Sequence, residues 1–77
     1  MSGNFYSDVD KLAQSLIDGG QAQVGEEIRE AVEAGSTGSE IMMRLRKAFQ
    51  DALRDAPLGD DDRASMTTLL DGINKVL

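Results

Sequence analysis

The sequence contains neither cysteine nor histidine. Without cysteine, the chain can form no disulfide and no thiolate metal site. Without histidine, it lacks the commonest general base and the commonest transition-metal ligand. No apolar run reaches the length of a membrane span, and no basic-then-apolar signal region opens the chain. We therefore expect a cytoplasmic protein that is not an enzyme, with no catalytic residues, no metal, no cofactor and no membrane partner.

The chain is short and acidic, and its charge is unevenly distributed. Its 77 residues predict one domain, residues 1–77. So small a domain is marginally stable, and association with a second copy or with a partner would stabilise it. The net charge of −6 divides into −5 for residues 1–35, +1 for residues 36–59 and −2 for residues 60–77. Charge of this size favours solubility, and the acidic half also suits a basic partner.

The junction around residues 35–40 has the clearest helix stop and start signals in the sequence. Gly35 follows an apolar helical stretch and suits the left-handed conformation after a helix end. Thr37 precedes Glu40 by three residues, which is the spacing of a capping box. In that motif the Thr37 hydroxyl accepts the Glu40 N–H, and the Glu40 carboxylate accepts the Thr37 N–H. One helix should therefore end before residue 35, and the next should begin near residue 38.

The same junction resembles a known group of proteins. Residues 35–41 read Gly-Ser-Thr-Gly-Ser-Glu-Ile and are closely followed by Leu45-Arg46. This stretch is similar to short bacterial all-helical proteins of unassigned function that carry Gly-Ser-Thr-Gly-x-Glu-Ile. Beyond this stretch the resemblance extends only to a helical pattern. It implies a bacterial origin and a small helical domain, and it assigns no site residues.

Apolar residues recur at helical spacing in four segments, and no segment shows a strand pattern. Gly19-Gly20 should form a turn, and Pro57 should end the third helix. The sequence therefore predicts an all-α fold, a compact bundle of four short antiparallel helices. The expected helices cover residues 4–18, residues 21–34, residues 38–55 and a final segment that begins at residue 60. Their apolar stripes contain Phe5, Val9, Leu12, Ala13, Leu16 and Ile17; Val24, Ile28, Ala31 and Val32; Ile41, Leu45, Ala48, Phe49, Ala52 and Leu53, with Met42 at the edge; and Met66, Leu69, Leu70, Ile73 and Leu77.

Two local features need an explanation within this fold. Gly25 lies inside the second expected helix, where glycine costs about 1 kcal/mol against alanine. Close approach of another helix is the expected reason. The run Asp60-Asp61-Asp62 suits a helix N-terminus, as cap and dipole partners, because the spacing of an EF-hand loop is missing.

Two surfaces of opposite charge are the candidate partner-binding sites. The acidic stripe is Glu26, Glu30 and Glu33, which share one face of the second expected helix. The basic surface lies on the outer side of the third expected helix, where an apolar methionine is surrounded by basic and polar residues. It consists of Met43, Arg46, Lys47, Gln50 and Arg54.

These surfaces favour a small acidic protein-interaction module without catalytic activity. Its partner would be another, unidentified protein or a second copy in a homodimer. Within this class, the charge pattern suits an immunity-like inhibitor of a basic toxin or an adaptor. The chain has no Gly-rich phosphate loop, and a bundle of this size has little room for an active-site pocket.

Two alternatives remain. The length, acidity and four helices resemble acyl carrier proteins, but Ser36 and Ser39 lack the preceding Asp and following Leu of the carrier motif. A helix-turn-helix spacing predicts DNA binding instead, but the acids of the preceding helix would oppose phosphate binding, so nucleic acid is not the expected partner. That spacing is formed by Ala31, Gly35 and Ile41, with Arg44, Arg46 and Lys47 on the recognition helix.

Overall fold

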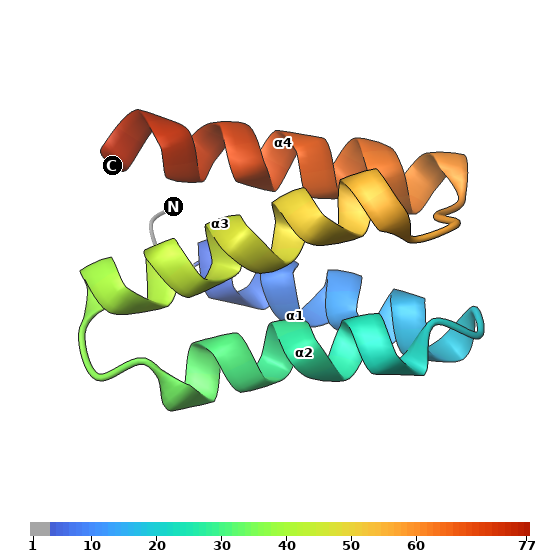
Figure 1. Ribbon diagram of the computed structural model, residues 1–77, viewed down its shortest axis with the longest axis horizontal. Coiled ribbons are helices and arrows are strands. Elements are labelled where there is room, and N and C mark those ends of the chain that lie inside the picture. The colour runs from blue at the N-terminus through green and yellow to red at the C-terminus, as the bar shows by residue number, and fades with distance from the viewer. Residues whose placement is uncertain (1–3) are drawn as a thin grey trace.

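A computed structural model describes the backbone of residues 4–77 and the side chains of residues 5–77. It contains four helices, α1 (Asn4–Asp18), α2 (Ala22–Ala34), α3 (Gly38–Asp55) and α4 (Asp60–Val76). The chain runs back and forth, so that each helix is antiparallel to the one before it (Figure 1). Each helix packs on its neighbours in the sequence, and α4 closes the ring by packing on α1. The predicted all-α bundle of four short antiparallel helices is confirmed.

The turn between α1 and α2 follows the Schellman pattern. Gly20 has a φ of 93°, a left-handed conformation that glycine adopts without strain. The Gly20 N–H donates to the Ile17 carbonyl at 3.3 Å, and the Gln21 N–H donates to the Leu16 carbonyl at 2.7 Å. These bonds satisfy the last carbonyl groups of α1 and turn the chain so that α2 returns along α1.

The junction between α2 and α3 confirms one half of the predicted capping box and corrects the other. The Glu40 N–H donates to the Thr37 hydroxyl at 3.2 Å, as predicted. The Glu40 carboxylate accepts the N–H of Ser36 at 2.9 Å, one residue earlier than the predicted Thr37. The left-handed conformation predicted for Gly35 is wrong, because its φ is −73° and its ψ is 137°. Glycine is needed at position 35 for space, since a β-carbon there would collide with the Ile41 side chain.

The connection between α3 and α4 shows the expected effect of proline. Ala56 precedes Pro57 and is extended, with a ψ of 142°. Asp60, Asp61 and Asp62 form the first turn of α4, where the helix dipole favours negative charge. None of them caps the helix, because the cap position is taken by Gly59 without a side-chain hydrogen bond. The predicted dipole role therefore fits their position, and the predicted cap role is wrong.

The core lies along the bundle axis and is formed by the predicted stripes. Ile17 of the first stripe is not part of this core, and Leu77 is a second exception, because 48% of its surface is exposed. It follows the last turn of α4 and lies beyond the core. The buried apolar side chains are Val9, Leu12, Ala13, Leu16, Ile28, Ala31, Leu45, Phe49, Ala52, Met66 and Ile73. Between residues 4 and 77, no helix has the length and apolar character needed to cross a membrane.

Candidate functional site

A groove lies between α1 and α4 and is here called the α1–α4 groove. Its volume is about 510 Å³, which lies within the roughly 300–1,000 Å³ range of binding sites. Both walls of the groove are helical, and α1 and α4 pack less closely than the other neighbouring helix pairs. The groove is lined by Asp8, Lys11, Leu12 and Ser15 of α1 and by Asp61, Asp62, Ala64, Ser65, Thr68 and Leu69 of α4.

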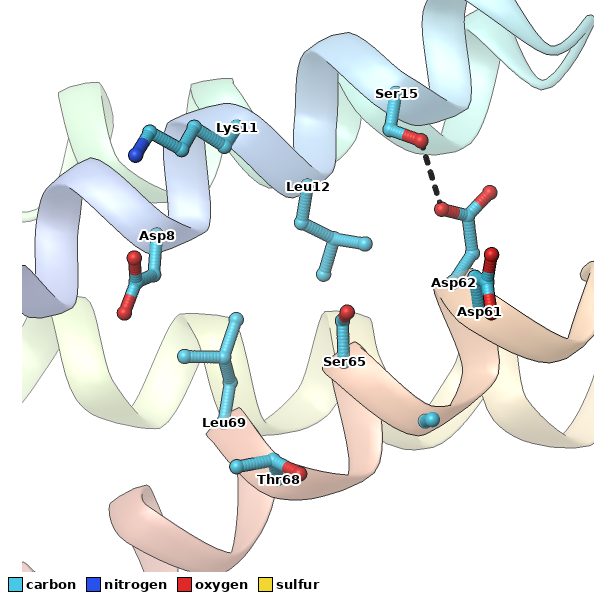
Figure 2. Close-up of a pocket in the computed structure, with 10 residues that line it drawn as sticks. Asp8, Lys11, Leu12, Ser15, Asp61, Asp62, Ser65, Thr68 and Leu69 are labelled. Carbon is cyan, nitrogen blue, oxygen red and sulfur yellow. Dashed lines mark hydrogen bonds between the residues drawn. The ribbon is translucent and has the colours of Figure 1, made fainter.

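The groove has an apolar floor. Figure 2 shows the Leu12 and Leu69 side chains facing each other across it. Leu12 is only 4% exposed and belongs to the core, while Leu69 is half-buried against the core. The α4 wall beside them is built from small polar side chains, Ser65 and Thr68, both of which are exposed. Because these side chains are short, they leave the space between the helices unfilled, so Leu69 stays partly exposed while Leu12 beside it is buried.

Carboxylates lie at both ends of the groove. Asp8 is at one end, and Asp61 and Asp62 are at the other (Figure 2). The Ser15 hydroxyl donates to the Asp62 carboxylate at 2.8 Å and links α1 to α4 at that end. Lys11 on the α1 rim is the one basic side chain in the lining, against three acids. The lining therefore carries a net charge of −2, from three acids and one base, and an apolar centre separates its two ends.

The acidic stripe predicted on α2 is exposed along its length, since Glu26, Glu30 and Glu33 all face solvent. Among residues 5–77, none of these carboxylates forms an ion pair or a side-chain hydrogen bond. Arg29, the basic residue of α2, bonds to α1 instead. Its Nε donates to the Asp10 carboxylate at 3.1 Å, and its Nη2 donates to the Gln14 side-chain oxygen at 2.9 Å.

The basic surface predicted on α3 carries less available charge than the sequence indicates. Lys47 pairs with Asp51 at 3.3 Å, and Arg54 pairs with Asp51 at 3.0 Å and with Asp55 at 3.2 Å. A hydrogen bond to Asp55 and the charges of Asp55 and Asp51 raise the pKa of the Arg54 guanidinium above its ordinary value. Met43 is exposed, as predicted, with half of its surface accessible. Local acids therefore neutralise much of this surface.

Two residues of the basic surface, Gln50 and Arg46, take no part in these ion pairs. Gln50 is exposed, and Arg46 is half-buried. Arg46 forms no ion pair with any described residue of the chain. Arg44, the neighbouring basic residue of the predicted recognition helix, lies 3.9 Å from the Glu40 carboxylate. Lys47 and Arg44 thus have nearby carboxylate partners, which compete with any phosphate ligand.

The structure also shows the serines that the carrier hypothesis requires, and the acidic side chains that a metal site would require. Ser36 and Ser39 are exposed beside the N-terminus of α3, as a modified serine would have to be. The carrier and DNA-binding alternatives remain hypotheses. Within the described part of the chain, no three acidic side chains group closely enough to hold a metal ion.

Sequence reasoning missed the α1–α4 groove as a site. The sequence pattern places Leu12 and Leu69 in apolar helix stripes, and it gives no separate signal for the hydroxyl groups of Ser15, Ser65 and Thr68. The available signal was that α4 places Ser65 and Thr68 near Leu69, where a tightly packed helix would carry larger apolar side chains.

Comparison of the chain with protein-family models, with curated proteins and with solved structures gave no match. The resemblance to short bacterial proteins therefore remains a hypothesis.

Proposed function

We propose that this chain is a non-catalytic protein-interaction module that binds a partner protein in the α1–α4 groove. The observation that carries the proposal is the groove itself, in which the half-buried Leu69 and the buried Leu12 form an apolar floor between polar helical walls (Figure 2). Protein interfaces have this organisation, in which a central apolar area is buried by the partner and a polar rim surrounds it. An inhibitor of the immunity type and an adaptor would both use such a surface.

The groove is a stronger candidate than the basic surface of α3. Asp51 and Asp55 already pair with Lys47 and Arg54, so an acidic partner would have to displace these contacts. Exposed pairs of this kind contribute little energy, but they lower the local positive charge that would attract a partner. The acidic stripe of α2 has no intramolecular partner among the described residues, and the hollow that Glu33 borders, with Tyr6 and Val32, has a volume of about 220 Å³, less than half that of the α1–α4 groove.

The proposal is tested by blocking the groove. Ser65→Tyr places a large side chain over the leucine floor from an exposed position, so the fold should be retained. Ser39→Tyr is the matched control, because Ser39 is also exposed on a helix but lies outside the groove. Wild-type and variant proteins are immobilised and incubated with lysate of the source cells, and bound proteins are identified by mass spectrometry.

We expect a protein that is captured by the wild type and by Ser39→Tyr, and that is lost from Ser65→Tyr. Circular dichroism would establish that both variants remain helical. If the same protein binds equally to Ser65→Tyr, the groove is not the interaction site. If the wild type captures nothing above empty beads, the proposed function itself is wrong.

A further inference from the structure

We propose that the α1–α4 groove binds a basic amphipathic helix of another protein, with Lys or Arg at positions i and i+7 and apolar residues at i+3 and i+4. This inference rests on the proposed function and names the chemistry of the partner. It depends on the spacing of the carboxylates, on the position of the leucines and on the helical form of both walls.

The carboxylates of the groove are separated by two helical turns. Asp8 and Ser15 are seven residues apart on α1, and a helix rises about 1.5 Å per residue, which gives roughly 10 Å along the groove. The Ser15 hydroxyl donates a hydrogen bond to the Asp62 carboxylate, so Asp62 lies on the opposite wall at the same level along the groove as Ser15. A bound helix aligned with α1 has the same rise, and its residues i and i+7 would therefore meet the two acidic ends.

The apolar centre determines what must lie between the two basic residues. Leu12 and Leu69 face each other midway along the groove, between Asp8 and the Ser15–Asp62 hydrogen bond (Figure 2). On a bound helix, positions i+3 and i+4 share the face of i and i+7 and lie between them. Apolar side chains at these positions would fill the groove and cover the exposed part of Leu69. Ser65 and Thr68 would then border the interface with their hydroxyl groups.

A helix fits this site better than an extended peptide. Peptides bind in extended form by adding a strand to a sheet edge or by docking as polyproline II in an aromatic-lined groove. Residues 4–77 contain no strand, and the lining of the groove contains no aromatic side chain. A groove between helices instead receives the apolar face of an amphipathic helix. Lys11 weakens the negative potential at the Asp8 end, but three carboxylates remain against one ammonium group, so a basic ligand is favoured.

A second copy of this chain does not supply the required helix. In its sequence, Lys47 and Arg54 are the one pair of basic residues at a spacing of seven. The residues at i+3 and i+4 from Lys47 are Gln50 and Asp51, which are polar and acidic. Asp51 also pairs with both basic side chains. The partner must therefore be a different protein.

A synthetic peptide tests the inference directly. The probe is a fluorescently labelled, alanine-based helical peptide with Lys at i and i+7 and Leu at i+3 and i+4. A second peptide of identical composition has its lysines at i and i+5, which places them on different faces of the helix. Binding of each peptide to the full-length protein is measured by fluorescence anisotropy at low and at physiological salt.

Variants of the protein separate the groove from general attraction to an acidic chain. Asp8→Lys and Asp61→Lys reverse one charge at each end of the groove, and Ser65→Tyr blocks its centre. Glu26→Lys makes the same charge change on α2, which packs against α1 and α3 rather than α4. Circular dichroism and the melting temperature check that each variant is folded.

We expect the first peptide to bind the wild type and Glu26→Lys equally, and to bind each groove variant about tenfold or more weakly. The second peptide should bind about tenfold more weakly than the first. Absence of wild-type binding at low salt would overturn the inference, as would equal losses in Glu26→Lys and in the groove variants. If the peptide fails while a cellular protein is still lost from Ser65→Tyr, the proposed function stands and the assigned ligand chemistry is wrong.

Discussion

Gly25 of α2 lies so close to Ala13 of α1 that a β-carbon at position 25 would be 2.6 Å from the Ala13 carbonyl oxygen. The Ile17 side chain blocks the same space, with its Cγ1 atom 2.7 Å from that β-carbon. The cost of glycine within a helix is therefore offset by the close packing of two helices, as the sequence predicted. Backbone atoms cannot move aside as the end of a flexible side chain can, so this contact fixes the distance between α1 and α2.

We expect Gly25→Ala to destabilise the protein. Overpacking at such a contact costs about 1–3 kcal/mol, which exceeds the gain of about 1 kcal/mol in helix propensity. The free energy of unfolding, measured by urea denaturation, should therefore fall by up to about 2 kcal/mol. A more stable variant would show that α1 and α2 lie farther apart in solution.

Gly72→Ala should have the opposite effect. Gly72 is also inside a helix, α4, but a β-carbon there would meet no atom within 4 Å. Alanine should therefore stabilise the protein by up to about 1 kcal/mol, because it restricts the unfolded chain and favours the helix. The same urea experiment compares it with Gly25→Ala. A loss of stability would mean that α4 contacts another surface at this position.

Replacement of both Thr37 and Glu40 by alanine should destabilise the N-terminus of α3. It removes the hydrogen bond from the Glu40 N–H to Thr37 and the one from the Ser36 N–H to Glu40. The expected loss is about 1–2 kcal/mol, and the melting temperature should fall by several degrees. The single variant Glu40→Gln should retain most of the stability, because its amide oxygen can still accept the Ser36 N–H. An unchanged melting curve for the double variant would place the start of α3 elsewhere.

Asp51→Asn should change stability only slightly. Asp51 pairs with both Lys47 and Arg54, but these side chains are largely exposed. Exposed ion pairs contribute about 0.2–1 kcal/mol, and the difference from wild type should shrink at high salt because the charges are screened. Thermal melts at low and high salt measure both quantities. A salt-independent loss of several kcal/mol would contradict this account of the basic surface.

The isolated chain should be monomeric in solution. The pairing of Asp51 with Lys47 and Arg54 leaves little free positive charge on α3 to meet the acidic stripe of a second copy. Light scattering should therefore give a mass near 8.3 kDa at low and high salt, for the wild type and for Met43→Asp alike. A wild-type dimer that Met43→Asp converts to a monomer would place an interface on α3 instead.

Much of the fold was determined by the sequence alone, because its signals are local. Apolar residues at helical spacing defined the four helices, and the boundaries of α3 follow from the Thr37 cap and from Pro57. The error at Gly35 shows the limit of such reasoning. Glycine after a helix usually indicates a left-handed residue, but here it makes room for Ile41 in the next helix. Whether a glycine provides a backbone angle or space depends on what packs against it.

The candidate site was decided by the tertiary structure. The acidic ends of the α1–α4 groove come from the first and the last helix, so no local pattern connects Asp8 with Asp62. The sequence marks Leu12 and Leu69 as apolar residues of a helix stripe, but not whether large neighbours cover them. That depends on the distance between α1 and α4, which the packing of all four helices determines together. Spacing along the chain fixes which residues share a helix face, whereas only the assembled bundle fixes which faces meet and which stay open.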